Sequence, residues 1–183
     1  GTYSCTLGGA DAADFACSIS GSTVNVAFAS SPDYENPADA DTNNVYIVTV
    51  LINDGAANDA NGATTLTITV ADLNDQAPSF TSSNAVDVAE GAAAVVTLAA
   101  TDTDSADSGG LAYAIVTDDP ASGTQFSLSG TSLTIAAQDY ETPGCGAGAD
   151  SLTCTVIVSA TDDAGAATQQ TITVTITDTN DQT

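Results

Sequence analysis

The chain has 183 residues, of which 24 are acidic and none is Lys, Arg or His, so its formal net charge at pH 7 is -24. Without basic residues it cannot neutralise phosphates, which excludes nucleic-acid binding and adhesion to an anionic membrane through a basic patch. A histidine base, a lysine Schiff base and an arginine clamp are excluded as well, while 43% hydrophobic residues indicate a folded protein.

Short runs in which apolar and polar residues alternate predict β-strands. In the run 64–72, Leu66, Ile68 and Val70 alternate with threonines, which places the apolar side chains on one face of a half-buried strand. Gly, Asp, Asn and Pro clusters separate the runs at a spacing typical of antiparallel sandwiches, and no run has the period of an amphipathic helix. In chain order the predicted strands cover residues 4–7, 22–28, 46–54, 64–72, 94–101, 111–116, 131–137, 154–162 and 170–178.

Two motifs occur twice at the same separation. The string DYE begins at Asp33 and again at Asp139, and the pattern D-x-N-D begins at Asp72 and again at Asp178, so in both cases the copies lie 106 residues apart. Each copy also has two strand-like runs between its motifs. Such a repeat indicates homologous domains. We therefore predict two domains, residues 1–76 and residues 77–183.

The acidic residues are concentrated in loops. Of the 24 acids, 21 are Asp, and the three Glu residues, Glu35, Glu90 and Glu141, all lie in loop motifs. The exposed faces of the predicted strands carry Thr instead, whereas an acidic coat that serves only solubility would spread over them. Calcium binds 6 to 8 oxygen atoms from carboxylates, amides and backbone carbonyls. The distribution therefore favours calcium-binding loops over a merely solvated acidic surface.

Five motifs in a fixed order resemble tandem extracellular cadherin repeats. They are DYE, the string DLNDQAPSF at 72–80, VAEG at 88–91, ATDTD at 100–104 and ATD at 160–162, and together they span nearly the whole chain. The resemblance implies an all-β protein of two tandem Greek-key β-sandwiches, Ig-like and of cadherin type, joined by a calcium-binding linker. It also implies three Ca²⁺ ions at each junction between successive repeats.

The resemblance further implies a set of ligands at the junction between the two repeats. Seven of them are carboxylates, with a formal charge of -7 that three Ca²⁺ ions would reduce to about -1. One pair of like charges 4 Å apart costs about 4 kcal/mol at an effective dielectric constant near 20, so the cluster needs cations to stay compact. The implied ligands are Asp33, Glu35, Asp72, Leu73 through its carbonyl, Asn74, Asp75, Asp102, Asp104 and Asp162.

Each end of the chain carries part of a further junction. The C-terminal half-site implied by the resemblance contains Glu90, Asp139, Glu141, Asp178, Asn180 and Asp181, and the N-terminal half-site contains Asp54. Tyr3 aligns with Tyr113, so the first repeat is expected to lack a first strand and the loop that matches Glu90. Asp11 lies outside every motif, which makes it a candidate control position for substitution.

The four cysteines predict disulfides in an oxidising setting. Cys5 and Cys17 flank the first loop between strands, and Cys145 and Cys154 flank the loop after the second DYE. Four cysteines allow three connectivities. The two local pairs, Cys5–Cys17 and Cys145–Cys154, are favoured because each closes a short loop within one repeat, and buried free thiols are the alternative.

These observations lead to two hypotheses of function. The first is a calcium-binding, calcium-rigidified extracellular module of a cell-adhesion protein, whose partners are further cadherin-like repeats or like molecules in homophilic association. The second is a structural spacer or a subunit of an extracellular filament. Both place the chain outside the cell or at its surface. An enzyme is not expected, because the acid pairs lie in a repeated array, and no apolar run reaches the roughly 20 residues that insert into a membrane.

Overall fold

The computed structural model describes residues 3–55, 62–104, 110–118, 125–142, 144–145 and 153–180, without the side chains of residues 95 and 118. Contacts within the chain divide it into two compact units, Gly1–Leu73 (unit 1) and Asn74–Thr183 (unit 2). The division falls three residues before the predicted boundary at 76/77. Over the described ranges the only helical element is a single 3-10 turn, η1 (Ala12–Asp14), and no helix there is long and apolar enough to span a membrane.

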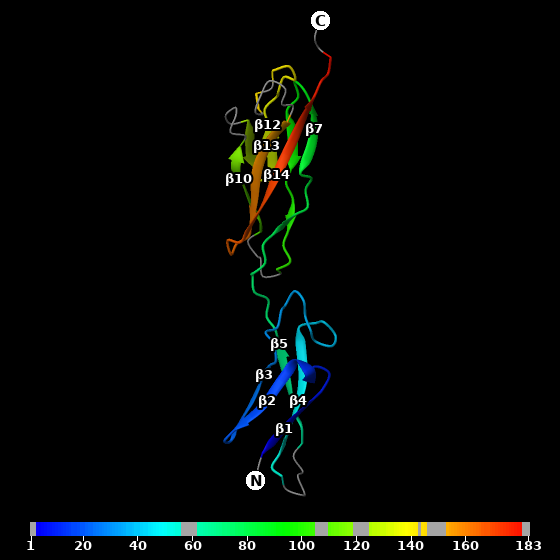
Figure 1. Cartoon of the computed structure of the whole chain (residues 1–183), viewed down its shortest axis with the longest axis vertical. Helices are drawn as coiled ribbons and strands as arrows, with labels where there is room; N and C mark the ends of the chain where they lie inside the picture. Colours follow the sequence, from blue (N-terminus) through cyan, green and yellow to red (C-terminus); the bar gives the residue numbers. More distant parts are fainter. Residues whose placement is uncertain are drawn as a thin grey trace. The chain divides into compact units, whose positions relative to one another are not determined.

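Unit 1 contains a three-stranded antiparallel sheet and a two-stranded hairpin (Figure 1). In the sheet the order is β1-β4-β5, and β2 pairs with β3 across a turn at Gly21, whose φ of 63° suits glycine. The strand bounds are β1 Ser4–Gly8, β2 Phe15–Ser20, β3 Thr23–Phe28, β4 Val45–Asn53 and β5 Thr64–Thr69.

Unit 2 is a more complete sandwich of two larger sheets (Figure 1). One sheet has the order β10-β13-β14-β7, in which β7 is parallel to β14, and the other has the order β11-β12-β8. Strands β6 and β9 form a small additional pair. The bounds are β6 Ser79–Phe80, β7 Ala85–Ala89, β8 Ala94–Thr97, β9 Ala100–Thr101, β10 Ala112–Asp118, β11 Phe126–Ser129, β12 Ser132–Ile135, β13 Thr153–Thr161 and β14 Ala167–Thr177.

Strict alternation places the apolar residues of unit 2 between its sheets. Ile172, Val174 and Ile176 of β14 are 0%, 1% and 2% exposed, and the intervening threonines face outward. The register pairs Val156 of β13 with Ile172, so the inward residues of neighbouring strands lie side by side. Leu133 of β12 closes the core from the opposite sheet with no exposed surface.

Unit 1 has a smaller core built on aromatic rings. Phe15, Tyr46 and Val48 are buried there, and the Tyr46 ring meets those of Phe15 and Phe28 edge-to-face, with centroids 5.8 and 5.0 Å apart. Leu66 and its neighbours on β5 are only partly buried. The all-β sandwich predicted from the strand pattern is confirmed.

Both disulfides join the local pairs. Cys5–Cys17 links β1 to β2 and so connects the two sheets of unit 1, while Cys145–Cys154 ties the loop after the second DYE to β13. The structure contains no free cysteine among the residues described.

Candidate metal centre

The residues that follow the unit boundary form hydrogen bonds with two loops of unit 2. The backbone N–H of Gln76 donates to Asp104 Oδ2 over 2.8 Å, and the Asn74 side chain donates through Nδ2 to Asp163 Oδ1 over 2.6 Å. Asp104 lies in the loop that follows β9, and Asp163 lies in the turn between β13 and β14. Because both loops contact segment 74–76, they lie at the same end of unit 2.

One carboxylate oxygen of Asp102 stabilises the D-x-D loop. Asp102 Oδ1 accepts the backbone N–H of Asp104 over 3.0 Å. The other oxygen, Asp102 Oδ2, is buried and has no hydrogen-bond partner, and Asp104 Oδ1 is in the same condition. Asp104 as a whole is only 5% exposed.

Asp162 shows the same division between a bonded and an unpartnered oxygen. Its Oδ1 accepts the backbone N–H groups of Gly165 and Ala166 over 2.6 and 2.8 Å, which closes the turn between β13 and β14. Gly165 has a φ of 93°, a conformation that favours glycine. Asp162 Oδ2 is buried without a partner, although the residue is 6% exposed.

Buried carboxylate oxygens without donors are costly, since burial of an unpaired charge is strongly unfavourable. No side chain of this protein can supply a compensating positive charge, because it has no Lys, Arg or His. The orphaned atoms of Asp102, Asp104 and Asp162, together with the buried and unpartnered Oδ1 of Asn74, are carboxylate and amide oxygens. Carboxylate and amide oxygens are the donors that Ca²⁺ prefers, so the chemistry of these atoms fits a calcium ion.

The other predicted junction residues have less specific surroundings. Asp75 is exposed and accepts a hydrogen bond from Gln76 Nε2 over 2.9 Å. In unit 1, Asp33 Oδ1 accepts the backbone N–H groups of Glu35 and Asn36, both over 3.1 Å. Asp72 is partly buried and Leu73 is 69% exposed. A junction that draws on both units therefore stays a prediction.

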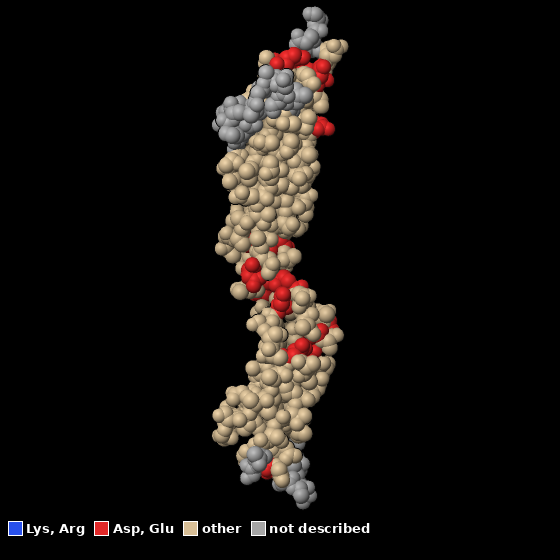
Figure 2. Space-filling view, in the orientation of Figure 1, with Lys and Arg blue, Asp and Glu red and all other residues tan. Residues whose placement is uncertain are grey.

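A second acidic cluster lies at the opposite end of unit 2, where Figure 2 also shows acidic side chains gathered. Ligand atoms of Glu90, Asp139 and Glu141 lie within 4.8 Å of one another. Glu90 accepts the backbone N–H of Thr179 over 2.7 Å and that of Tyr140 over 2.9 Å, and these bonds to its charged form lower the pKa of its carboxyl.

The remaining residues of the predicted C-terminal half-site form hydrogen bonds within their own turns where the structure describes them. The Thr142 hydroxyl donates a hydrogen bond to Asp139 over 2.7 Å, and the backbone N–H of Glu141 donates another over 3.0 Å. Both bonds favour the ionised carboxylate and lower the pKa of Asp139. Asp178 Oδ1 accepts the N–H of Asn180 over 2.7 Å. Asp181 lies outside the described residues.

The predicted N-terminal half-site and the proposed control position have different outcomes. Asp54 follows β4 and belongs to no group of three potential ligands in the part of the chain that the structure describes. Asp11 is 4% exposed, and its two oxygens accept the backbone N–H groups of Ala40 and Ile47 over 2.8 and 2.6 Å. Asp11 is thus a structural residue that links its own loop to the loop at Ala40 and to strand β4, so the expectation that it is a neutral control position is wrong.

Two residues that form hydrogen bonds with predicted ligands were not identified from the sequence motifs. Asp163 holds Asn74, and Thr179 holds Glu90, also through its hydroxyl over 2.9 Å. Each lies next to a predicted ligand in the sequence, Asp162 and Asp178 respectively. That adjacency was the only available signal, because both contacts join residues 89 positions apart.

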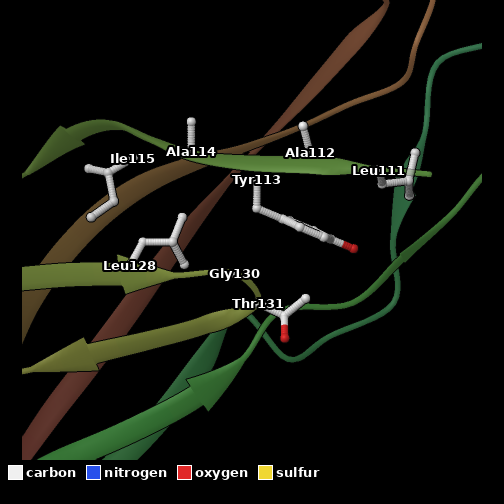
Figure 3. A pocket seen from close by; sticks show the side chains of 8 residues that line it. All are labelled: Leu111, Ala112, Tyr113, Ala114, Ile115, Leu128, Gly130 and Thr131. Atoms are coloured by element: carbon white, nitrogen blue, oxygen red, sulfur yellow. The ribbon is translucent and has the colours of Figure 1, made fainter. Parts of the chain in front are cut away.

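Unit 2 also has a groove between the edge strands β10 and β11 of its two sheets (Figure 3). Its volume is 520 Å³, and the Tyr113 side chain lies between the two strands. The lining residues contain no charged group and no cysteine; they are Leu111, Ala112, Tyr113, Ala114, Ile115, Leu128, Gly130 and Thr131. The polar side-chain groups among these residues are the hydroxyls of Tyr113 and Thr131.

Comparison with known proteins shows similarity at the level of structure. No family model matches the chain, and no curated protein matches it. Among solved structures, the protocadherin gammaB7 EC3-6 cis-dimer matches with a TM-score of 0.69 and 24% identity over 98% of this chain and 42% of that one. Protocadherin Gamma B2 extracellular cadherin domains 1-5 match with a TM-score of 0.71 and 22% identity, over 98% and 34%. Mouse clustered PcdhgC3 EC1-3 matches with a TM-score of 0.65 and 21% identity, over 97% and 56%.

The chain has the fold of extracellular cadherin repeats. This likeness to protocadherin ectodomains extends over nearly all of the chain and confirms the resemblance inferred from the motifs. The chain spans less than two thirds of the length of each of these solved chains.

Proposed function

We propose that the chain is a calcium-binding module of an extracellular adhesion protein, and that calcium makes its two repeats rigid relative to each other. The observation that carries the proposal is the set of buried, unpartnered oxygens on Asp102, Asp104 and Asp162 in a protein without any cationic side chain. The cadherin-repeat fold supports an extracellular location, as do the two disulfides.

The proposed junction combines residues of both units. Unit 2 would contribute the unpartnered oxygens of its acidic loops, the Asn74 amide and Asp75. From unit 1 would come Asp33, Glu35, Asp72 and the carbonyl of Leu73. A bound ion supplies positive charge that offsets repulsion between the carboxylates. Because ligands from both units would share ions, binding would restrict the motion of one unit relative to the other.

Calcium titration of the whole chain by calorimetry tests the site. Asp104→Asn removes a charge from a residue with an unpartnered buried oxygen, and Asp87→Asn removes the same charge from the exposed side of β7 in the same unit. We expect Asp104→Asn to weaken calcium binding at least tenfold and Asp87→Asn to change it little. Equal effects, or no calcium uptake at millimolar concentration, contradict the proposal. Magnesium should substitute poorly, because it prefers a smaller octahedral shell and retains water.

Small-angle scattering tests the rigidification separately. Chelation should broaden the distribution of end-to-end distances while far-UV circular dichroism stays almost unchanged, because the apolar cores do not use the ion. Added sodium chloride should restore only part of the stiffness, since screening weakens repulsion but supplies no coordination. A distance distribution that chelation leaves unchanged would refute the shared junction.

A structural spacer or filament subunit is the second candidate, and the open edges of unit 1 favour it. Strands β5 and β3 each have one described neighbour, whereas β14 and β12, at the equivalent places in unit 2, each have two. An unpaired strand edge accepts a further strand from another molecule. Sedimentation velocity at several calcium concentrations distinguishes the candidates, because a filament subunit should form polymers. If the chain stays monomeric and beads coated with it aggregate in calcium, adhesion between like molecules is favoured instead.

A further inference from the structure

One contact at the linker end of unit 2 involves an acid that is not among the proposed ligands. Asp163 accepts a hydrogen bond from Asn74 Nδ2 over 2.6 Å, and both residues belong to unit 2. Asp163 directly follows Asp162, whose carboxylate closes the turn between β13 and β14. The contact thus connects the segment after the unit boundary to a turn that is itself fixed by hydrogen bonds.

The contact determines which way the Asn74 carboxamide faces. An ionised carboxylate only accepts hydrogen bonds, so it must meet the NH₂ arm of the amide and not the oxygen arm. With Nδ2 held by Asp163, the Oδ1 atom is directed elsewhere, and in the structure it is buried with no partner. A buried amide oxygen without a donor is unfavourable, although less so than the charged oxygens of Asp104 and Asp162, and a bound cation would satisfy it.

We propose that Asp163 is a positioning residue for calcium: it orients Asn74 so that the amide oxygen is available as a ligand, and it holds segment 74–76 against unit 2 before the ion binds. The hydrogen bond from the Gln76 N–H to Asp104 is a second contact that holds this segment against unit 2. Ligands that are oriented in advance lose less freedom on binding, and partners of this kind typically change metal affinity by 10- to 100-fold. The inference rests on the proposed calcium site.

A purely electrostatic role of Asp163 predicts different behaviour. If it acts only through its negative charge, every substitution that removes the charge should weaken calcium binding equally. Asp163→Asn and Asp163→Ala remove the same charge, but only the asparagine retains an oxygen that can accept from Asn74 Nδ2. The difference between these two variants therefore isolates the hydrogen bond from the electrostatic effect.

Calorimetric calcium titration of the full chain is the first test. We expect Asp163→Ala to bind calcium about tenfold more weakly than Asp163→Asn, and Asp163→Asn to resemble the charge control Asp87→Asn. In an Asn74→Leu background, which has no amide to orient, the two substitutions should become equal. Equal affinities of Asp163→Ala and Asp163→Asn in the wild-type background overturn the inference, and so does a difference that persists with Leu at position 74.

A measurement without calcium keeps the inference separate from the proposed function. In chelated protein, NMR should show the Asn74 side-chain NH₂ protected from solvent exchange in the wild type and in Asp163→Asn, but not in Asp163→Ala. An unprotected NH₂ in the wild type overturns the inference even if calcium binds. If the wild type binds no calcium, the proposed function fails instead, whereas the NH₂ measurement still decides whether Asp163 holds Asn74. Should Asp163→Ala not fold, the wild-type and Asp163→Asn spectra remain sufficient to contradict the contact.

Discussion

Strands β5 and β14 have nearly the same sequence pattern but differ in burial. Ile172, Val174 and Ile176 of β14 are at most 2% exposed, whereas the residues 106 positions earlier, in β5 and directly after it, are only partly buried. The parallel strand β7 covers one side of β14, and the sheet containing β8 faces it. Neither strand has a counterpart in the described part of unit 1. An alternating pattern therefore specifies which face turns inward, and the neighbouring strands decide how far it is buried.

The two DYE loops show the same dependence on the first strands. In unit 2 the N–H of Tyr140 donates to Glu90, which lies directly after β7. In unit 1 the carbonyl of Tyr34 instead accepts from Asn44 Nδ2 over 2.9 Å, a contact within a single loop. The first strands of a repeat thus provide both a cover for the core and a carboxylate that fixes an acidic loop.

Truncation of a core side chain should give the largest difference in stability loss between the two units. Ile172→Ala should destabilise unit 2 by about 2 to 5 kcal/mol, because it leaves a cavity in a closed core. Leu66→Ala should destabilise unit 1 by about 1 kcal/mol, since only part of that side chain leaves water on folding. Hydrogen exchange followed by mass spectrometry on peptides from each unit measures both effects. Similar losses of protection would mean that β5 is as well covered as β14.

Reduction of the disulfides should affect unit 1 more than unit 2. Each bridge closes a short loop, with sequence separations of 12 and 9, which corresponds to about 3 kcal/mol on loop-entropy arguments. Among the described residues, the core cluster of unit 1 has three buried members and that of unit 2 has twelve, so unit 1 has less core packing to compensate for the loss of its bridge. We expect a reductant to abolish exchange protection in β1 and β2 while β13 and β14 stay protected. Loss of protection in unit 2 first would reverse this ranking.

The smallest expected effect is the contribution of Glu90 to the pH dependence of unit 2. The N–H groups of Thr179 and Tyr140 lower the pKa of Glu90, so its ionised form is favoured in the folded state. The resulting stability is present above the ordinary pKa of a glutamic acid, about 4.3, and is lost as the pH falls through the lowered value.

Melting curves in chelator between pH 7 and pH 3 measure this contribution. Glu90→Gln should lower the melting temperature of unit 2 at neutral pH and reduce its fall on acidification. The melting of unit 1, which lacks such a residue in its DYE loop contact, should not respond to this substitution. Parallel pH curves for the wild type and Glu90→Gln would show that the carboxylate contributes no stability of this kind.

Sequence patterns predicted most of the strands but missed four of them. The predicted run 154–162 nearly coincides with β13, and 64–72 contains β5. Strands β2, β6, β7 and β11 were missed, because they have six residues or fewer and are rich in Ala and Ser, so that they carry little periodic signal. β7 is also stabilised by parallel pairing with β14, a partner almost ninety residues away.

The sequence by itself determined the properties that are local or additive along the chain. These are the absence of cationic side chains, the alternation that makes strands, the repeat at 106 residues, and the loops in which carboxylates gather. Only the tertiary structure decided that Asp11 is a buried link from its loop to strand β4, that Asp163 accepts a hydrogen bond from Asn74, and which carboxylate oxygens lack a donor. Each of these depends on groups distant in sequence, because a carboxylate becomes structural or available for a cation according to the donors that the fold brings within about 3 Å of each oxygen.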